Sequence, residues 1–335
     1  MSESDPLADV RARVAALLAE HDPATTDRLE FLRARYDAGL AWVHFPPGHG
    51  GLGYPRDLQA VVDAELAAAG APDNDPAGNA IGLGMAAPTI LAYGTEEQKR
   101  RYLRPLWTGE EIWCQLFSEP GAGSDLAGLA TRAVPDGDGW VVNGQKVWTS
   151  AAHRADFGIL VARTDPDVPK HRGLTYFICD MHAPGVQVRP LRQITGEAEF
   201  NEVFLTDVRI PDSQRLGAVG EGWRVATTTL NAERVAIGDG PTPREGGMIG
   251  VVAKAWRDHP ERRRSALHDR LLRLWVESEV ARLTRMRLRQ KLAAGLPGPE
   301  GATMKLTFAR LNQALSGLEV ELREDDGIRY DDWSF

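Results

Sequence analysis

The residues best suited to chemistry lie in a glycine-, serine- and tryptophan-rich stretch between Trp113 and Ser150. Residues 119–125, EPGAGSD, bring two glycines and a serine into a turn, where backbone N–H groups can approach an anion because no Cβ is in the way. Phosphate or pyrophosphate is a natural ligand for such a turn. Trp148 and Thr149 then end a predicted strand together with Ser150. Their flat ring and two hydroxyls can stack beside an isoalloxazine and hydrogen-bond its polar edge, so one flavin dinucleotide could span both groups.

A further candidate is Glu233, which lies in the run 227–237, TTTLNAERVAI, among small and apolar residues. Burial against apolar walls raises the pKa of a carboxyl group and makes it a stronger base. The residues alone nevertheless favour a simpler interpretation, an ion pair between Glu233 and Arg234 on the surface of a helix.

Four motifs, in the family's order, make the chain resemble the acyl-CoA dehydrogenases. They are YGTEEQK at 93–99, EPGAGSDLAG at 119–128, NGQKVWTS at 143–150 and LNAER at 230–234. The resemblance runs from about residue 38 to Glu233, is weak to about residue 300 and returns faintly at 304–306. It therefore covers most of the chain but not its end.

The resemblance implies an α+β fold in three domains. These are an N-terminal helical domain (1–113), a central antiparallel β-barrel-like domain that binds flavin (114–216) and a C-terminal helical bundle, here incomplete (217–335). In the family, the small-residue stretch 78–88 between the first helices also helps to wall the acyl pocket. Close helix packing explains each of its residues at least as well.

The resemblance also implies one FAD and assigns its contacts residue by residue. The implied flavin contacts are Gln115, Phe117 and Ser118 at the ring, Gly123 and Ser124 at the phosphates, and Trp148 and Ser150 at the redox edge. Gln115 departs from the family, many of whose members have an aromatic residue there. For Trp148 the alternative is a strand residue packed in the core. Ser124 and Arg234 are further candidates for contact with the substrate, and no metal ligand is expected.

The implied reaction is the α,β-desaturation of an acyl-CoA thioester in lipid catabolism, as in β-oxidation. A base removes a proton from the carbon next to the thioester while hydride leaves the following carbon for the flavin. Some family members carry this base in a similar Leu-Asn-x-Glu-Arg context, which identifies Glu233. Others carry it in a C-terminal Glu-Gly-Thr motif, which this chain lacks. A bulky or branched acyl group and an electron-transfer flavoprotein, or a similar acceptor, are expected.

Two departures leave alternatives open. The Arg-x-x-Phe-Gly motif, which in many members reaches the flavin of a neighbouring subunit, is missing from residues 254–264. The sequence also stops at Phe335, where the family would add further helices, so we expect either a truncated sequence or a partner subunit that completes the bundle. A homo- or hetero-oligomer, dimer or tetramer, is implied. The alternatives are a non-catalytic or half-site subunit of a heteromeric acyl-CoA dehydrogenase, and a flavin oxidase or monooxygenase on the same scaffold.

The composition is that of an ordinary globular protein: 335 residues, 43% hydrophobic and 26% charged, with a formal net charge of -8. This acidic balance argues against a nucleic-acid surface. Two cysteines, with no signal-peptide pattern and no run long enough to span a membrane, predict a cytoplasmic protein. His44 and His49 are expected to be loop residues rather than metal ligands.

Apolar periodicity predicts the elements that must position these groups. Helices are expected over residues 7–22, 27–38 and 58–69, with another beginning at the cap Thr95. From Gln115 the period changes to two, and strands are expected at 157–163, 174–179, 186–191 and 202–205. Turn signals lie at 135–139 and at Asn143-Gly144, which suits a type I′ hairpin. We therefore expect a closed or nearly closed antiparallel sheet.

The helical period returns after residue 222. Near the end, apolar residues alternate steps of four and three, a pattern typical of a helix buried against other helices. This seam consists of Met304, Phe308, Leu311, Leu315, Leu318 and Leu322.

Overall fold

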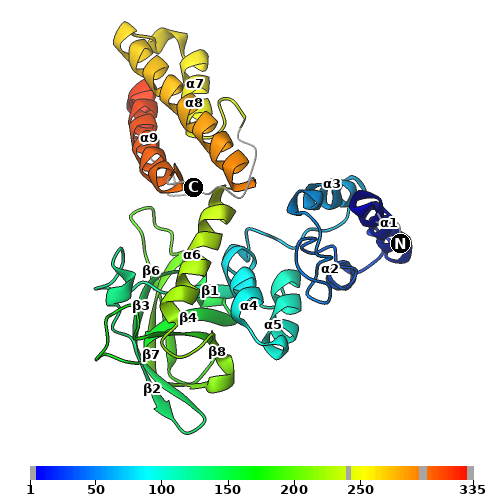
Figure 1. The fold of residues 1–335 in the computed structure, drawn as a ribbon. Helices are drawn as coiled ribbons and strands as arrows, with labels where there is room; N and C mark the ends of the chain where they lie inside the picture. Colours follow the sequence, from blue (N-terminus) through cyan, green and yellow to red (C-terminus); the bar gives the residue numbers. More distant parts are fainter. Residues whose placement is uncertain (1–4, 239–242, 294–299, 330–335) are drawn as a thin grey trace. The chain divides into compact units, whose positions relative to one another are not determined.

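The computed structural model describes residues 5–238, 243–293 and 300–329, and it describes no side chains at 234–238, 292–293 and 300–302. The chain forms two compact units, Met1–Ala236 and Ile237–Phe335, each of which is described by itself (Figure 1). The first contains three groups of elements: N-terminal helices, a sheet and the helices that cover the sheet. The fold is α+β, as predicted.

Four N-terminal helices form where the sequence predicts them, namely α1 (Pro6–Glu20), α2 (Arg28–Asp37), α3 (Gln59–Ala68) and α5 (Glu96–Thr108). A further helix that was not predicted, α4 (Ala87–Tyr93), precedes α5. The side chain of Thr95 accepts from the backbone of Gln98, while the Gln98 side chain accepts from Thr95 N–H, so the predicted cap is a complete capping box. The small-residue stretch before α4 contains a π-turn, η2 (Gly82–Ala86), in which Met85 and Ala86 are buried.

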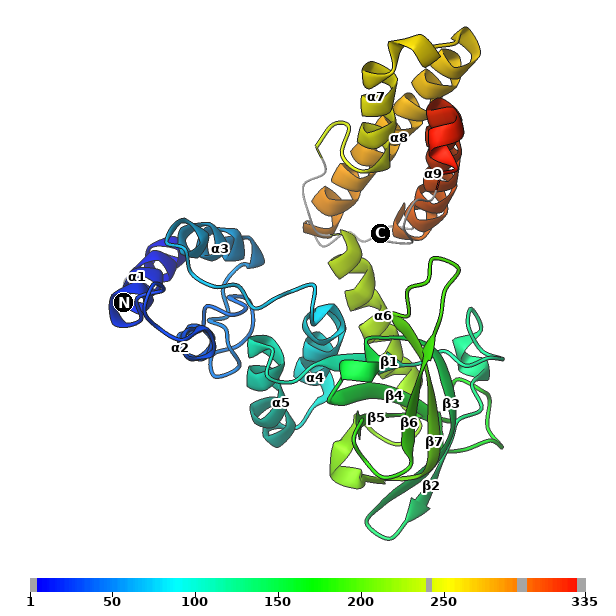
Figure 2. The same ribbon diagram turned by 180° about the vertical axis from the view of Figure 1, so that it is seen from behind.

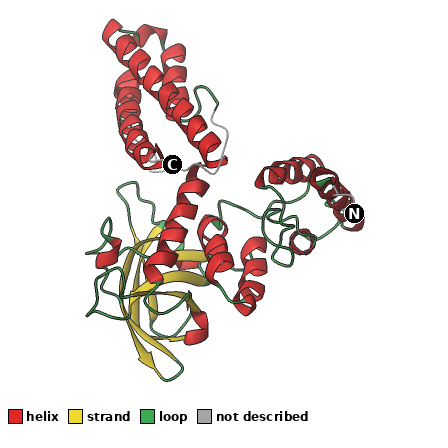
Figure 3. Ribbon diagram, in the orientation of Figure 1, coloured by secondary structure: helices red, strands yellow, loops and turns green. Residues whose placement is uncertain are grey.

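The middle of the first unit is one eight-stranded sheet (Figure 3). Its strands are β1 (Trp113–Leu116), β2 (Arg132–Asp136), β3 (Gly139–Ser150), β4 (Phe157–Arg163), β5 (Leu174–Asp180), β6 (Val186–Leu191), β7 (Phe200–Pro211) and β8 (Arg215–Leu216). The order is β6-β7-β3-β2-β4-β5-β8, with β1 paired to β4. The pairing is mainly antiparallel, as predicted, but β1 and β2 both run parallel to β4. Among the described residues β6 and β8 end the path, so the sheet is open rather than closed.

Short helical turns join these elements. They are η1 (Arg56–Leu58), η3 (Leu126–Gly128), η4 (Ala152–Arg154), η5 (Asp212–Gln214), η6 (Pro260–Arg262) and η7 (Glu324–Gly327).

The central strands are buried on both faces because residues alternate between two cores. Ile159 and Val161 of β4 belong to the core shared with the helices, whereas Leu160 and Ala162 belong to a core formed mainly by the sheet itself. Helix α6 (Gly222–Gly238) joins the first of these cores through Val225 and Ala226, as does α4. Both views show α4 and α6 beside β1 and β4 (Figures 1 and 2). This face of the sheet is therefore the one covered by helices.

The expected hairpin at Asn143-Gly144 is wrong, because both residues lie inside β3. The chain turns earlier, between Asp136 and Gly139, which face each other in the pairing of β2 with β3. Gly144 meets a different requirement, since a Cβ there would lie 2.3 Å from Thr131 Oγ1 and 2.7 Å from Thr131 Cα. The glycine permits close packing across the sheet at a register shift, not a turn.

The second unit is built from α7 (Met248–Asp258), α8 (Ser265–Ala293) and α9 (Glu300–Arg323). The seam prediction is confirmed for its last four residues, because Leu311, Leu315, Leu318 and Leu322 are buried in a core with α7 and α8. It is wrong for Phe308, which is 48% exposed. Of the described helices, none is long and apolar enough to cross a membrane.

Candidate active site

The predicted phosphate-binding turn lies in the loop 119–131, between β1 and β2. Gly121, Gly123 and Ser124 are exposed there, and a Cβ built on either glycine would meet no atom within 4 Å. Within the described part of the chain, the backbone N–H groups of Gly123 and Ser124 donate no hydrogen bond. The turn therefore presents free donors beside open space, which is what an anion requires.

Charged side chains hold this loop in place from outside. The guanidinium of Arg163 donates to the carbonyls of Ala127 (2.6 Å) and Leu129 (3.0 Å). Lys170 donates to both carboxylate oxygens of Asp125, each at 2.8 Å. These contacts fix the shape of the loop, although its glycines have no side chains that could do so.

Trp148 stands in an unusual backbone conformation near the end of β3. Its φ of 60° lies in the left-handed region, within the register shift between Lys146 and Thr149 in the pairing with β7. The indole is 62% exposed and meets Phe200 edge-on, with 6.0 Å between ring centroids. A strained non-glycine residue costs about 1–3 kcal/mol, and such residues gather at ligand sites. The alternative of a core-packed Trp148 is wrong, and the ring offers a flat face to a ligand.

The segment that follows β1 lies against this bulge, because Val147 N–H donates to the carbonyl of Ser118 at 2.9 Å. Phe117 is buried and meets Tyr176 edge-on, at 5.8 Å between ring centroids. Gln115 is partly buried and, by the alternation of β1, shares the helix-covered face with Phe117. Ser150, also partly buried, ends β3 opposite Phe200. The structure thus brings the residues around 117–118 together with the Trp148 bulge.

Glu233 lies on α6, one turn after the fully buried Thr229. The Thr229 hydroxyl hydrogen-bonds those of Thr89 (2.8 Å) and Tyr176 (2.9 Å), which ties α6 to α4 and β5. Residues four apart share a helix face, so Glu233 continues the face that meets α4 and the sheet. Glu233 is partly buried and interacts with other groups of the chain. The Arg234 side chain lies outside the described residues, so its contacts with Glu233 and with substrate stay predictions.

Two buried polar groups near the site escaped sequence reasoning. One is the hydroxyl network of Thr229, Thr89 and Tyr176. The other is an ion pair between Lys146 and Glu119, with 2.9 Å from Nζ to Oε1. Burial lowers the pKa of Lys146 to about 8 against the opposing effect of Glu119. Burial also acts to raise the pKa of Glu119, but Lys146 and backbone N–H donors outweigh it and leave that pKa below its usual value.

The donor set around the glycine turn and the bulge fits FAD. Free N–H groups and the Ser124 hydroxyl suit a pyrophosphate, and the exposed Trp148 ring suits an isoalloxazine. Ser150, two residues further on, adds a hydroxyl. No group of three or more His, Cys, Asp or Glu side chains in the described residues could hold a metal ion.

The histidines of the loop 44–53 have local partners. His44 meets Phe45 edge-on, and burial lowers its pKa to about 4. His49 Nε2 lies 3.2 Å from Glu96 Oε2. Within this loop, a Cβ on Gly51 would lie 2.1 Å from the carbonyl oxygen of Phe45, which supports a structural role for the glycine.

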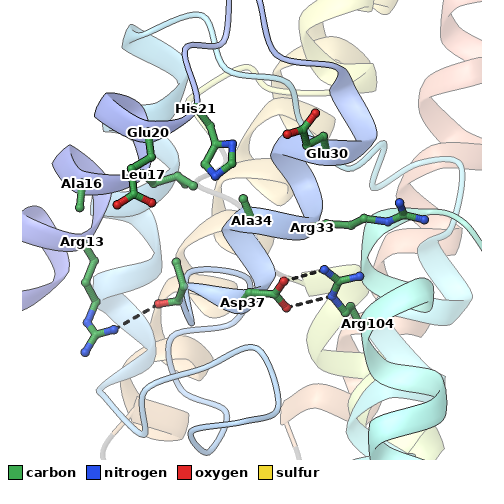
Figure 4. A pocket seen from close by; sticks show the side chains of 11 residues that line it. Arg13, Ala16, Leu17, Glu20, His21, Glu30, Arg33, Ala34, Asp37 and Arg104 are labelled. Carbon is green, nitrogen blue, oxygen red and sulfur yellow. Dashed lines mark hydrogen bonds and ion pairs between the residues drawn. The ribbon is translucent and has the colours of Figure 1, made fainter.

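A separate pocket of about 570 Å³ lies among α1, α2 and α5 (Figure 4). Its lining residues are Arg13, Ala16, Leu17, Glu20, His21, Glu30, Arg33, Ala34, Asp37, Ala38 and Arg104. Arg104 donates to both carboxylate oxygens of Asp37, at 2.9 and 2.6 Å. None of the predicted site residues lines it.

Three family models match the chain in succession. They describe the N-terminal domain of acyl-CoA dehydrogenases (residues 8–110), the middle domain (114–208) and the C-terminal domain (220–335). The predicted three-domain boundaries remain a prediction, because the compact units divide only at Ala236.

Similar proteins carry related names. The chain is 43% identical over 327 residues to the acyl-CoA dehydrogenase FadE34 of Mycobacterium tuberculosis (strain ATCC 25618 / H37Rv), with 96% of the chain covered. It spans only 44% of FadE34's own length. Among solved structures, the Tcur3481-Tcur3483 steroid ACAD is 27% identical with a TM-score of 0.73, covering 99% of this chain and 89% of that one. The ChsE4-ChsE5 complex from Mycobacterium tuberculosis is 28% identical with a TM-score of 0.70, covering 100% and 90%.

Proposed function

The chain belongs to the acyl-CoA dehydrogenase family, and from that premise we propose that it is an FAD-dependent dehydrogenase that desaturates an acyl-CoA thioester between its α and β carbons. The observation that carries the proposal is the exposed Trp148 ring, held in a left-handed bulge against the segment that follows β1. A strained aromatic residue beside a glycine turn with free N–H groups is a suitable platform for a flavin.

FAD, when bound, accepts the hydride that leaves the β carbon. Gly123 and Ser124 would hold its phosphates, while Gln115, Phe117, Ser118, Trp148 and Ser150 would surround its ring. Of these residues, Phe117 is buried with Tyr176 in the core that the sheet shares with α4 and α6, so water is excluded on this side of the proposed ring site. Exclusion of water strengthens the electrostatic interactions of the reacting groups.

Glu233 is the proposed base that removes the α proton. The support is its place on a partly buried face of α6, one turn after Thr229. The hydroxyls of Thr89, Thr229 and Tyr176 hold the preceding turn of α6. The turn of α6 that precedes Glu233 is therefore tied to α4 and β5.

For the substrate, we propose an acyl-CoA with a bulky, steroid-like acyl group. The support is the similarity to a solved steroid ACAD. In this chain the small-residue stretch, which contains η2, shares a core with α6, where an acyl group would need room. Ser124 and Arg234 stay candidate contacts to the substrate.

For the assembly, we propose that the chain works with a second acyl-CoA dehydrogenase-like chain, as one subunit of a hetero-oligomer. The support is twofold: the ChsE4-ChsE5 structure is a complex, and FadE34 is more than twice as long as the matched segment. A half-site role within such a complex is the alternative that these observations favour. The electron acceptor is proposed to be an electron-transfer flavoprotein. A cytoplasmic location is compatible with the two buried free thiols, Cys114 and Cys179.

The test is the rate at which acyl-CoA reduces the flavin without oxygen, in the wild type and in Glu233→Gln, both purified with any partner chain. General base catalysis contributes about 10²- to 10⁴-fold, so the rate should fall by at least about 100-fold in Glu233→Gln with unchanged FAD content. The matched control is Glu221→Gln, because Glu221 precedes the same helix, is partly exposed and pairs with Arg224. Full turnover by Glu233→Gln would eliminate Glu233 as the base.

A further inference from the structure

The ammonium of Lys146 is fully buried inside the β-domain, which is rare for a lysine. Its three N–H donors meet three acceptors: Phe117 O (3.0 Å), Glu119 Oε1 (2.9 Å) and Val161 O (2.9 Å). Three donors are all that an ammonium has. The lysine therefore connects β3 to the end of β1, to β4 and to the loop 119–131, called the glycine loop below. No N–H donor of its ammonium is left without an acceptor.

The carboxylate of Glu119 accepts three hydrogen bonds. Besides Lys146, it accepts from the backbone N–H groups of Ala130 (2.6 Å) and Thr131 (2.9 Å). Glu119 begins the glycine loop, and Ala130 and Thr131 end it. The buried carboxylate of Glu119 thus joins the two ends of the glycine loop by hydrogen bonds.

Lys146, the other member of the ion pair, lies beside the bulge that contains Trp148. Lys146 lies two residues before Trp148, at the position where the register shift in β3 begins. Val147, between them, donates to Ser118 at 2.9 Å. The turn with free N–H groups and the left-handed Trp148 are therefore attached to the same ion pair, one on each side.

We propose that Lys146 and Glu119 are positioning residues, which hold the glycine turn and the Trp148 ring at the separation that one FAD molecule needs. The inference rests on the proposed function, since it assumes that both groups bind the same flavin. Neither side chain needs to touch the cofactor. Their role is to link its two binding surfaces, so a change at the pair should reach both the affinity and the environment of the ring.

The experiment measures the Kd for FAD and the visible circular dichroism of bound FAD in four proteins. They are the wild type, Lys146→Met, Glu119→Gln and the double variant. Each single change leaves one buried charge without its partner, and we expect FAD to bind at least about tenfold more weakly with an altered spectrum. The double variant removes both charges, so its loss should be smaller than the sum of the two single losses. Arg209→Met is the control, because Arg209 forms an exposed pair with Asp136 in the same sheet.

The outcomes separate the two claims. Variants that bind FAD with wild-type affinity and an unchanged spectrum would overturn the positioning role alone. If a single variant does not fold, the double variant decides: wild-type affinity with an unchanged spectrum contradicts the role, whereas an altered spectrum in a folded protein supports it. A wild type that binds FAD but is not reduced by any acyl-CoA contradicts the proposed dehydrogenase alone. A wild type that takes up no FAD contradicts both.

Discussion

The site region of the sheet contains a buried ion pair, whereas several ion pairs of the C-terminal unit are exposed. Around the glycine loop, Lys146 and Glu119 are buried and bind backbone groups as well as each other. In the C-terminal unit, pairs such as Arg270 with Glu321 lie where both side chains are at least 40% exposed. Exposed pairs contribute about 0–1 kcal/mol, whereas breaking a buried pair costs about 3–5 kcal/mol. The buried pair therefore fixes positions in the first region, whereas an exposed pair such as Arg270 with Glu321 contributes little to holding the second.

The apolar side chains of the two regions also differ in how deeply they are buried. In the site region they are buried on both faces of the central strands. The long helix α8 instead leaves large apolar residues exposed within its own unit, namely Leu272, Val276, Val280, Leu283 and Met286. One buried seam, centred on α9, holds the C-terminal unit together.

The largest effect is expected when a lysine is replaced by methionine in the site region, compared with the same replacement in the C-terminal unit. Lys146→Met should lower the free energy of unfolding of the sheet region by about 3–5 kcal/mol, because Glu119 keeps a buried charge without a partner. Lys254→Met in α7 should change it by less than about 0.5 kcal/mol, since Lys254 pairs with Asp258 on the surface. Urea unfolding of both variants measures this. Equal effects at the two lysines would remove the basis of the comparison.

The next prediction examines what holds the C-terminal unit. Leu315→Ala should destabilise it by about 2–4 kcal/mol, since Leu315 is 3% exposed and its loss leaves a cavity in the seam. Leu306→Ala, on the same helix but 74% exposed, should cost less than about 0.5 kcal/mol. Hydrogen exchange of α7, α8 and α9 reports on this unit separately from the sheet. A large effect at Leu306 would instead show that its face is covered.

The smallest effect is a pH dependence within the sheet region. Asp212 accepts from Arg215 and from Trp140 Nε1, and these bonds lower its pKa to about 2. A lowered pKa stabilises the fold above the unfolded-state pKa of about 3.9, and that contribution is lost as the pH falls from about 4 to 2. Because the Asp212 side chain is 46% exposed and solvent therefore screens the pair, we expect Asp212→Asn to cost less than about 1 kcal/mol at pH 7.

Thermal unfolding from pH 7 to pH 2 measures the difference in stability between Asp212→Asn and the wild type at each pH. It should shrink toward zero at the acid end, where the wild-type carboxyl is protonated. A difference that persists at pH 2 would assign the effect to geometry rather than charge.

Much of the fold could be predicted because periodicity reports local structure. The strands 157–163 and 186–191 were predicted with the bounds that β4 and β6 have, and the Thr95 cap follows from its neighbours. Sequence reasoning failed at β3, where register shifts interrupt the alternation. A strand lysine is normally solvent-exposed, so nothing local indicated that Lys146 is buried. Asn143-Gly144 gave a turn signal that tertiary packing against Thr131 overrides.

The candidate site could be predicted only as a set of residues, through the motifs. Its geometry depends on contacts between segments far apart in the chain, such as Glu119 with Ala130 and Lys146. The left-handed Trp148 is likewise imposed by the pairing of β3 with β7. These long-range constraints have no periodic signature in the sequence.

The most direct test of the central claim is the visible absorption spectrum of the purified protein, titrated without oxygen with a panel of acyl-CoA thioesters that includes steroid-type acyl groups. FAD released by denaturation gives the stoichiometry. We expect a bound flavin whose visible absorption bleaches with at least one thioester. A colourless protein that takes up no added FAD, alone or with its partner, would contradict it.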